Sequence, residues 1–258
     1  MNRLRRRLRH VVRWMLVRGF FPSRTFLLGD KTGAEAVIVM CLWNRPSRID
    51  DVLRLLDAQD HPPGVVLMLW NNNSRDHRFY RDAISRFRSG GALREVVLAR
   101  SPQNVGSIGR FYLARRVGLK RPHTPVITLD DDQDVTPDFV SQTLAAYDQS
   151  AVSAWWAWVI EGSYWERRPA TVGEHVDHIG PGGSVCCVDV VTDPTFFTTI
   201  PEPYRMLDDI WLSYFAVQKG YRLAKLDVDI TFVMDETNQF HGQGSLKQEF
   251  YEYLKTRR

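Results

Sequence analysis

Four short apolar runs, each followed by an amphipathic stretch, constrain the fold of this chain most. The runs span residues 36–43, 65–70, 95–99 and 125–129. Runs this short and this continuously apolar are typical of strands buried on both faces. Strands that alternate with helices form a mostly parallel sheet with helices on its faces. The sequence therefore predicts an α/β fold, Rossmann-like, in which ligands bind beyond the carboxyl ends of the strands.

The second half of the chain follows a less regular pattern. It predicts one tryptophan-rich strand over residues 154–160, a flexible loop over residues 180–183 and a further strand over residues 185–191. A helix is expected to begin near Asp208, and Gly220 is well placed to end it.

The basic charge of the chain is concentrated at its start. Seven arginines occur in the first 18 residues: Arg3, Arg5, Arg6, Arg7, Arg9, Arg13 and Arg18. Without them, 27 of the 34 basic side chains remain against 30 acidic ones, so the rest of the chain is slightly acidic. That balance, with no recognisable motif for nucleic acid, predicts no nucleic-acid partner.

Apolar residues recur at helical spacing through the same segment, from Leu4 and Leu8 to Val11, Val12 and Met15. We therefore predict a basic amphipathic helix, and residues 1–21 are expected to lie on an anionic membrane surface. A solvated basic arm and a nucleic-acid-binding arm are the alternatives. No apolar run reaches the roughly 18 residues of a membrane span. The three cysteines are expected to be reduced core residues, which suits a cytoplasmic protein held peripherally at the inner face of the cell membrane.

Three consecutive aspartates, Asp130, Asp131 and Asp132, follow the fourth apolar run directly. Adjacent carboxylates repel one another and resist burial, and a divalent cation resolves that conflict. On an extended segment Asp130 and Asp132 point the same way while Asp131 faces elsewhere. The sequence thus predicts a site for Mn²⁺ or Mg²⁺, with a solvated acidic turn as the alternative.

Four segments, in this order, resemble the GT-A glycosyltransferases, specifically the family-two group. They are CLWNRPSRIDDVLRLLDAQ, NVGSIGRFYLARR, VITLDDDQDVTPDFV and LDDIWLSYFAVQKGY, and the resemblance covers residues 34–226. Each motif alone is weakly specific, whereas their order and spacing together are much stronger. The third segment carries the family's aspartate-any-aspartate motif, and the fourth carries its later acidic pair.

The resemblance implies a metal-dependent transfer of a sugar from a UDP- or GDP-sugar to an acceptor hydroxyl, with inversion. The acceptor would be a glycan or a lipid-linked molecule. Asp209 would be the general base, with Asp208 beside it. The metal would be held by Asp132 and Asp130, with His241 as a third ligand. The residues expected to bind the donor are Asn44, Arg45, Asn71, Asn72, Asn104, Asp130 and Asp131.

Aromatic and glycine residues complete the expected site. Trp156 and Trp211 are predicted to bind the acceptor, because aromatic faces suit the C–H side of a sugar ring. Gly182 and Gly183 permit a close approach of the backbone to the same ligand. The chain departs from the family at the end of the second strand, where Asn71 replaces the usual aspartate. Arg110 is one position away from the family's arginine and receives no role.

We expect a membrane-surface segment over residues 1–30 and a catalytic domain over residues 31–240. Residues 31–135 would bind the nucleotide-sugar, residues 136–240 would bind the acceptor, and residues 241–258 would form a tail. Two other classes remain as alternatives. A sugar-nucleotide nucleotidyltransferase would carry a glycine-rich phosphate loop, where this chain has Asn44-Arg45-Pro46. A non-catalytic membrane-surface binding protein would leave Asp208 and Asp209 unexplained.

Overall fold

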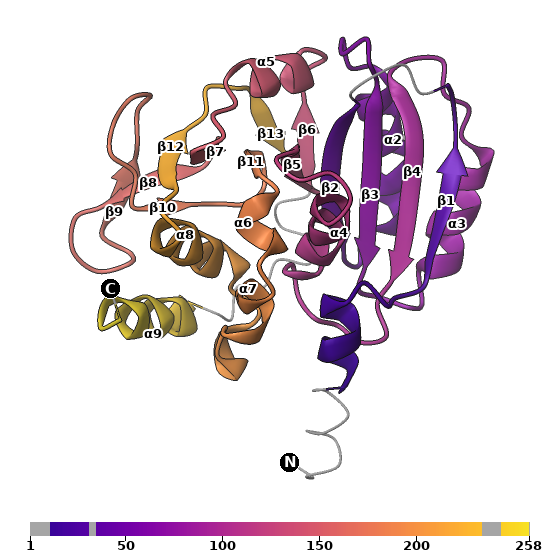
Figure 1. The fold of residues 1–258 in the computed structure, drawn as a ribbon. Helices are drawn as coiled ribbons and strands as arrows, with labels where there is room; N and C mark the ends of the chain where they lie inside the picture. The colour runs from indigo at the N-terminus through magenta and orange to yellow at the C-terminus, as the bar shows by residue number, and fades with distance from the viewer. Residues whose placement is uncertain (1–10, 31–34, 234–243, 258) are drawn as a thin grey trace.

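An eight-stranded sheet forms the centre of the molecule (Figure 1). The structure is a computed structural model that describes residues 11–30, 35–233 and 244–257. The strands of the sheet follow the order β1-β4-β3-β2-β5-β11-β7-β12. In that order their bounds are Ser23–Leu27, Leu93–Arg100, Val65–Asn71, Ala36–Leu42, Pro125–Asp130, Ser184–Cys187, Ala151–Ala154 and Arg222–Lys225.

The four strands predicted from the apolar runs form the parallel centre of this sheet. β4 pairs in parallel with β3, β3 with β2, and β2 with β5, while β1 and β11 flank them in the antiparallel direction. The expected α/β fold with a mostly parallel sheet is therefore confirmed. The carboxyl ends of β2, β3 and β5 lie along one edge of the sheet because parallel strands end on the same side.

Helices cover both faces of the sheet, which explains why its central strands are apolar throughout. All residues of β2 and β3 are buried. Val37 and Val39 belong to one core cluster, and Ile38 and Met40 belong to the other, because alternate residues of a strand face opposite sides. The longer helices are α2 (Ile49–Asp57) and α3 (His77–Arg86) over one face, and α4 (Gly109–Gly118), α8 (Asp208–Gln218) and α9 (Gly244–Lys255) over the other.

Short elements complete the fold. The helical ones are η1 (Pro46–Arg48), α5 (Phe139–Ala145), α6 (Asp189–Thr192), α7 (Thr195–Thr198) and η2 (Glu202–Tyr204). Two small sheets add β6 (Gln133–Val135) with β13 (Ile230–Phe232), and β8 (Ala157–Ile160) between β9 (Arg167–Pro169) and β10 (His178–Ile179).

Two elements of the second half differ from the prediction. The expected strand over residues 154–160 is two strands, β7 and β8, in different sheets, because the chain bends at Trp155 and Trp156. The expected strand over residues 185–191 ends at Cys187, and helix α6 follows. The predicted helix at Asp208 and its end near Gly220 are confirmed, and Gly220 has a positive φ of 85°. The three cysteines are buried and free, as expected.

The two ends of the described chain pack onto the same face of the sheet. Phe250 and Leu254 of α9 join the core cluster, and Phe250 stacks on Tyr204 with ring centroids 4.3 Å apart. Residues 11–17 form a helix that buries Leu16 and Val17 in that cluster. The expectations for residues 1–10 lie outside the described residues. The division into a surface segment, two halves and a tail stays a prediction.

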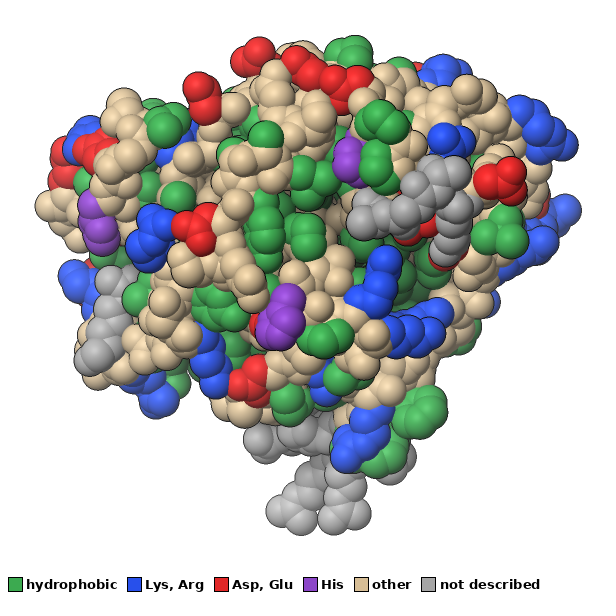
Figure 2. All heavy atoms as spheres, turned by 45° about the horizontal axis from the view of Figure 1, so that its top comes forward, with side chains coloured by type: hydrophobic (Ala, Val, Ile, Leu, Met, Phe, Trp, Pro, Cys, Tyr) green, Lys and Arg blue, Asp and Glu red, His purple; other side chains and the backbone are tan. Residues whose placement is uncertain are grey.

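The outer side of the N-terminal helix carries large apolar side chains. Val11, Trp14, Met15 and Phe20 are exposed, and the guanidinium of Arg18 lies 4.0 Å from the ring centroid of Trp14. Figure 2 shows hydrophobic and basic side chains next to each other at this lower end of the molecule. Among the described helices, none combines the length and the hydrophobicity that a membrane crossing requires.

Gly109 packs helix α4 closely against Trp70 of strand β3, and we predict that Gly109→Ala destabilises the fold. A Cβ atom at this position would lie 2.1 Å from Nε1 of the fully buried Trp70. Such overpacking costs about 1–3 kcal/mol in free energy of unfolding, measurable by urea denaturation. Gly90→Ala is the control, because a Cβ atom there meets nothing within 4 Å. Equal stability of the two variants would contradict this packing.

Candidate active site

A cleft of about 660 Å³ opens at the carboxyl ends of β2 and β5. Its walls come from strand ends, the loop before α4, the start of α8 and the 180–182 loop. The cleft brings together ten of the residues predicted from sequence: Arg45, Asn72, Asn104, Asp130, Asp131, Asp132, Trp156, Gly182, Asp208 and Asp209.

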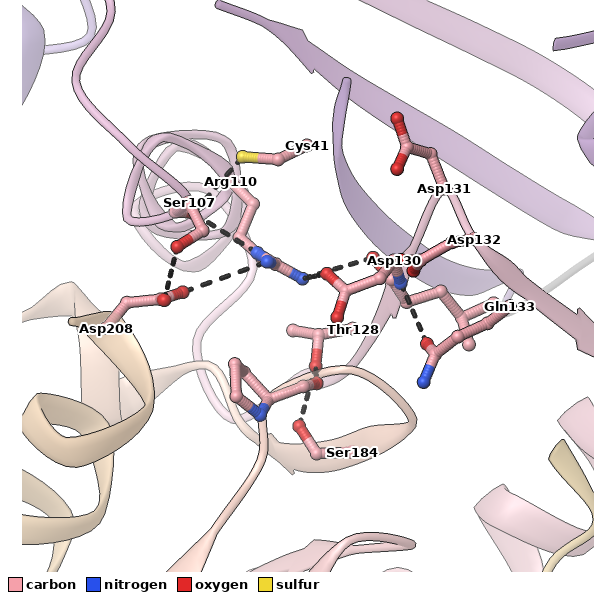
Figure 3. Close-up of polar contacts among 12 residues, drawn as sticks. Cys41, Ser107, Arg110, Thr128, Asp130, Asp131, Asp132, Gln133, Ser184 and Asp208 are labelled. Atoms are coloured by element: carbon pink, nitrogen blue, oxygen red, sulfur yellow. Dashed lines mark hydrogen bonds and ion pairs between the residues drawn. The ribbon is translucent and has the colours of Figure 1, made fainter. Parts of the chain in front are cut away.

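Asp131 differs from its two neighbours because its carboxylate is held by the turn after β2 from two sides. It accepts hydrogen bonds from Nη1 of Arg45 at 2.6 Å and from the backbone N–H of Trp43 at 3.2 Å. Burial raises its pKa to about 6. In Figure 3 Asp131 points away from Asp130, as the alternation along an extended segment predicts. Asp131 therefore fixes the turn after β2 onto the end of β5.

Arg110 links Asp130, at the end of β5, to Asp208, at the start of α8. Its side chain is buried, and Nη1 lies 2.6 Å from Oδ1 of Asp130, while Nη2 lies 3.8 Å from Oδ2 of Asp208 (Figure 3). Nη1 also donates to the backbone carbonyl of Leu129 at 3.1 Å. Ser107 donates a hydrogen bond to Asp208 from the other side. Two carboxylates from distant parts of the sequence thus share one buried cation.

Asp208 and Asp209 are adjacent in sequence but have opposite electrostatic surroundings. Burial raises the pKa of Asp208 to about 6, although Arg110 opposes the shift. Burial also disfavours the charged form of Asp209, but Lys247, together with His178 and the backbone N–H of Ile210, lowers the pKa overall. Nζ of Lys247 lies 2.6 Å from Oδ2 of Asp209. At neutral pH, Asp209 is therefore ionised and paired with Lys247.

His178 packs behind Asp209. Its Nε2 lies 3.9 Å from Oδ2 of Asp209 and 3.2 Å from the hydroxyl of Tyr164, and its Nδ1 lies 3.1 Å from Oγ of Ser213. Burial lowers the pKa of His178 to about 4, so its ring is neutral at physiological pH. His178 is thus a packed, neutral residue behind the cleft. His175 is exposed and pairs with Asp177.

The 180–182 loop comes close to Asp130. A Cβ atom at Gly182 would lie 2.2 Å from Oδ2 of that aspartate, so the loop can occupy this place only with glycine. Trp156 stands beside the loop, 44% exposed, with its ring centroid 4.9 Å from that of Phe232. An aromatic face is thus available at the mouth of the cleft.

Asn72 and Asn104 shape the loop between β4 and α4. Nδ2 of Asn72 donates to the carbonyl of Gly106 at 3.0 Å, and Oδ1 accepts from Val105 N–H at 3.2 Å. Oδ1 of Asn104 accepts from Gly106 N–H at 2.9 Å. Gly106 has a positive φ of 79°, which favours glycine at this turn. Both asparagines line the cleft, but their described hydrogen bonds serve the loop.

Four of the predicted residues do not line the cleft. Asn71 is fully buried and accepts a hydrogen bond from Asn73 N–H, and Asn44 is held to Asn73 by a 2.7 Å hydrogen bond. Gly183 packs behind the loop against Ile230. Trp211 is a core residue, because helix α8 turns its side chain inward and its indole donates to the Phe196 carbonyl at 2.7 Å. His241 lies outside the described residues.

Several lining residues were not predicted as site residues. Lys247 comes from α9, which the sequence analysis assigned to a tail, and nothing local in the sequence ties it to Asp209. Gln133 accepts from Asp130 N–H through Oε1 at 2.9 Å, and its Nε2 is buried without a hydrogen-bond partner among the described residues. Ser107 and Arg110 lie in the segment NVGSIGR, whose family resemblance was the one signal available for them.

The carboxylates of Asp130 and Asp132 fit a divalent metal ion. Both line the cleft, both offer hard oxygen donors, and the missing side chain of Gly182 leaves room beside Oδ2 of Asp130. Arg45 and Arg110 balance their charge, with Nη2 of Arg45 3.1 Å from Asp132. A separate group of His123, Cys187 and Asp189 lies at the opposite edge of the sheet, before β5 and after β11. It takes no part in the cleft.

No protein-family model and no curated protein sequence matches the chain. Solved structures do match. TarS from S. aureus (residues 1–349) is 16% identical with a TM-score of 0.50, and the match covers 77% of this chain and 60% of that chain. A mannosyltransferase from Pyrobaculum calidifontis, PcManGT, solved with GDP-Man and Mn²⁺, is 12% identical with a TM-score of 0.54, covering 95% of this chain and 71% of that chain.

The chain has a GT-A-like glycosyltransferase fold. At these identities the likeness establishes the GT-A fold alone, and the chain spans 60% of the TarS chain. The resemblance expected from the sequence is therefore confirmed at the level of the fold.

Because folding raises the pKa of Asp208 to about 6, its charge weakens the fold as pH rises. A carboxyl group whose pKa is raised on folding stabilises the fold most at pH values below its ordinary pKa near 4. This stabilisation is lost as pH rises past 6. We predict that Asp208→Asn gains stability relative to the wild type between pH 4 and pH 7. The gain is about 2–3 kcal/mol in the free energy of unfolding, measured by urea denaturation.

Asp193→Asn is the control for this experiment. Burial opposes ionisation of Asp193, but Lys219 and Thr195 outweigh it and lower the pKa to about 2. The stability that Asp193 contributes is lost only as pH falls below about 4, so this variant should show little trend between pH 4 and pH 7. If the stability difference between Asp208→Asn and the wild type is also independent of pH, folding does not raise the pKa of Asp208.

Proposed function

We propose that the protein is a metal-dependent glycosyltransferase that moves a sugar from a nucleotide-sugar to an acceptor hydroxyl, with inversion, in glycan or glycolipid synthesis. One observation carries the proposal: Asp130 and Asp132 lie in the same cleft as the ionised Asp209. A transferase of this kind needs carboxylates that hold a metal beside the donor diphosphate, and a separate carboxylate that takes a proton from the acceptor.

The donor side of the cleft contains Asp130, Asp132 and the loops of Arg45, Asn72 and Asn104. Asp130 and Asp132 would hold Mn²⁺ or Mg²⁺ together with the sugar diphosphate, and His241 remains a proposed third ligand. The metal would neutralise negative charge on the departing nucleotide diphosphate. PcManGT, which shares the fold, was solved with GDP-Man and Mn²⁺, which supports a UDP- or GDP-sugar as donor.

On the acceptor side, Asp209 acts as the general base. As the acceptor oxygen attacks the anomeric carbon, its proton passes to Asp209, and the bond from that carbon to the diphosphate oxygen breaks. Attack from the face opposite the leaving group inverts the anomeric centre. Lys247 holds the Asp209 carboxylate in place through a 2.6 Å ion pair. Trp156 offers its exposed face to a sugar ring of the acceptor.

The alternative of a sugar-nucleotide nucleotidyltransferase fits the turn after β2 poorly. That class binds phosphates through free backbone N–H groups of a glycine-rich loop, whereas here the N–H of Trp43 donates to Asp131. Asn44 takes a positive φ of 57° in a turn without glycine. A non-catalytic binding protein would have no use for an ionised Asp209 at the cleft.

Removing one metal-holding carboxylate tests the donor side. We expect Asp132→Asn to lower manganese-dependent turnover of UDP- or GDP-sugars on the order of 100-fold or more, because the diphosphate loses its counter-charge. Release of nucleoside diphosphate is the measurement. Asp227→Asn, an exposed carboxylate outside the cleft, should keep wild-type turnover. Production of a sugar nucleotide from a sugar phosphate and a nucleoside triphosphate would instead favour the nucleotidyltransferase.

The base is tested separately. Asp209→Asn keeps the shape of the side chain but cannot accept the proton, so the transfer rate should fall by about 10²–10⁴-fold. Binding of the nucleotide in the presence of manganese, measured by calorimetry, should stay unchanged. Near wild-type transfer by this variant would refute the assignment of Asp209.

We further propose that residues 1–21 hold the protein on the anionic inner face of the cell membrane. The exposed side chains Val11, Trp14, Met15 and Phe20 support this, because aromatic and aliphatic groups beside arginine favour a lipid interface. Leu16 and Val17 pack into the core, so the surface can be changed while the helix stays docked. Nucleic acid is not a partner in this proposal.

We expect Trp14→Glu with Phe20→Glu to reduce sedimentation with anionic phospholipid vesicles at least tenfold, since both side chains lose apolar contact and gain repulsive charge. The melting temperature should stay close to that of the wild type because both positions are exposed. The control carries the same change, to Glu, at the exposed Val172 and Trp165 in the second half of the chain. Equal vesicle binding by all three proteins would remove the membrane proposal.

A further inference from the structure

A second cavity, of about 490 Å³, lies beside the cleft under the N-terminal helix. Residues 11–17, residues 103–105 and the segment from α7 to Met206 enclose it. Asn104 and Met206 line both the cavity and the cleft. Sδ of Met206 lies 2.7 Å from the place of a Cβ atom at Gly106, so Met206 packs directly on the loop that separates the two spaces. A molecule held in the cavity is therefore next to the active-site cleft.

Most of the cavity wall is apolar and suits a hydrocarbon chain. The side chains that form it are Leu16, Val105, Ile108, Tyr112, Phe197 and Ile200. A space of this size and lining binds small apolar groups when a few polar groups fix their orientation.

Two arginines supply those polar groups. Nη2 of Arg13 and Nε of Arg205 are buried and have no hydrogen-bond partner among the described residues. Glu202 is the carboxylate on the lining, and its Oε1 lies 3.9 Å from Nη1 of Arg205. Two guanidinium groups against one carboxylate leave a net positive charge, and buried N–H donors without acceptors are costly. An anion with several oxygens would satisfy both.

The charge of Arg13 persists at neutral pH. Burial and the nearby charge of Arg205 lower its pKa to about 10, which is still well above 7. Arg13 also belongs to the helix whose outer side exposes Val11, Trp14 and Met15. The cationic groups of the cavity and the proposed membrane-facing surface are therefore parts of one short helix.

We infer that this cavity binds the phosphate group and the adjoining hydrocarbon of a lipid-linked acceptor, with Arg13 and Arg205 on the phosphate. The inference rests on the proposed function, because the acceptor hydroxyl must reach the cleft on the other side of Met206. Planar guanidinium groups match the oxygens of a phosphate, and the apolar wall takes the first carbons of the chain. The acceptor class is thereby narrowed from any glycan or lipid to a lipid phosphate.

Binding of octyl phosphate, measured by calorimetry, tests the cavity without the natural acceptor. We expect octyl phosphate to bind at least tenfold more tightly than inorganic phosphate. Arg13→Met and Arg205→Met should each weaken octyl phosphate at least tenfold. The matched control is Arg18→Met, an exposed arginine on the next turn of the same segment, which should leave the affinity unchanged. An equal loss in Arg18→Met would indicate a surface site for anionic headgroups and overturn the inference.

A cavity-filling variant covers the case in which an arginine variant does not fold. Ile200→Phe places extra carbon in the cavity and should abolish octyl phosphate binding while leaving manganese-dependent donor hydrolysis intact. With a polyprenyl-phosphate-linked sugar as acceptor, Arg13→Met should raise the KM for the acceptor at least tenfold and leave the KM for the donor unchanged.

The two proposals fail in different ways. Normal donor hydrolysis with equal affinities for octyl phosphate and inorganic phosphate overturns the lipid-phosphate site alone. Selective, Arg13-dependent binding of octyl phosphate by a protein that turns over no nucleotide-sugar overturns the glycosyltransferase and supports the cavity as a lipid-phosphate site.

Discussion

The buried guanidinium of Arg110 connects the parts of the cleft that the chain brings together from distant positions. It stands between Asp130, at the end of β5, and Asp208, at the start of α8. A buried charge is costly unless it is paired, and here each carboxylate is tolerated because the same cation faces both. The wall that holds Asp130 and the wall that holds Asp208 are therefore fixed relative to each other. The raised pKa of Asp208 is the remaining cost of this arrangement.

The three consecutive aspartates make different contacts although they are adjacent in sequence. All three line the cleft, and Asp131 also fastens the turn after β2 through Arg45. Arg45 reaches both Asp131 and Asp132, so these two carboxylates share one cation. Gly182 closes on Asp130 from the opposite side, which leaves that carboxylate a defined position. Repulsion among the carboxylates is relieved by arginines within the protein.

The N-terminal helix covers a second cavity that lies beside the cleft and differs from it in lining. The helix lies at the same end of the molecule as the carboxyl ends of β3 and β4 (Figure 1). It buries Leu16 and Val17, exposes Trp14, and turns Arg13 into the cavity beside the cleft. An exposed apolar surface, a cationic cavity and the proposed catalytic cleft thus follow one another over a short distance. That order suits an enzyme whose acceptor carries a lipid phosphate.

Much of the fold was predictable from the sequence because its signals are local. The continuous apolar runs of β2, β3 and β5 predict buried parallel strands, and the edge on which ligands bind follows from their direction. The tryptophan-rich segment misled the prediction, because strand propensity does not reveal the bend at Trp155 and Trp156 that sends β7 and β8 into different sheets. Trp211 was assigned to the acceptor for its residue type, but the face of α8 on which it lies is buried.

The sequence by itself determined the four buried strands at the centre of the sheet, the place of Asp130 to Asp132 at a strand end, and the acidic start of α8. Only the tertiary structure decided that Arg110 bridges Asp130 and Asp208, that Lys247 reaches Asp209 from α9, and that Arg13 and Arg205 line one cavity. Arg110 is 20 positions from Asp130 and 98 from Asp208, Lys247 is 38 from Asp209, and Arg13 is 192 from Arg205, as the residue numbers give. Local sequence patterns carry no record of such pairs, because burial and the packing of whole elements select them.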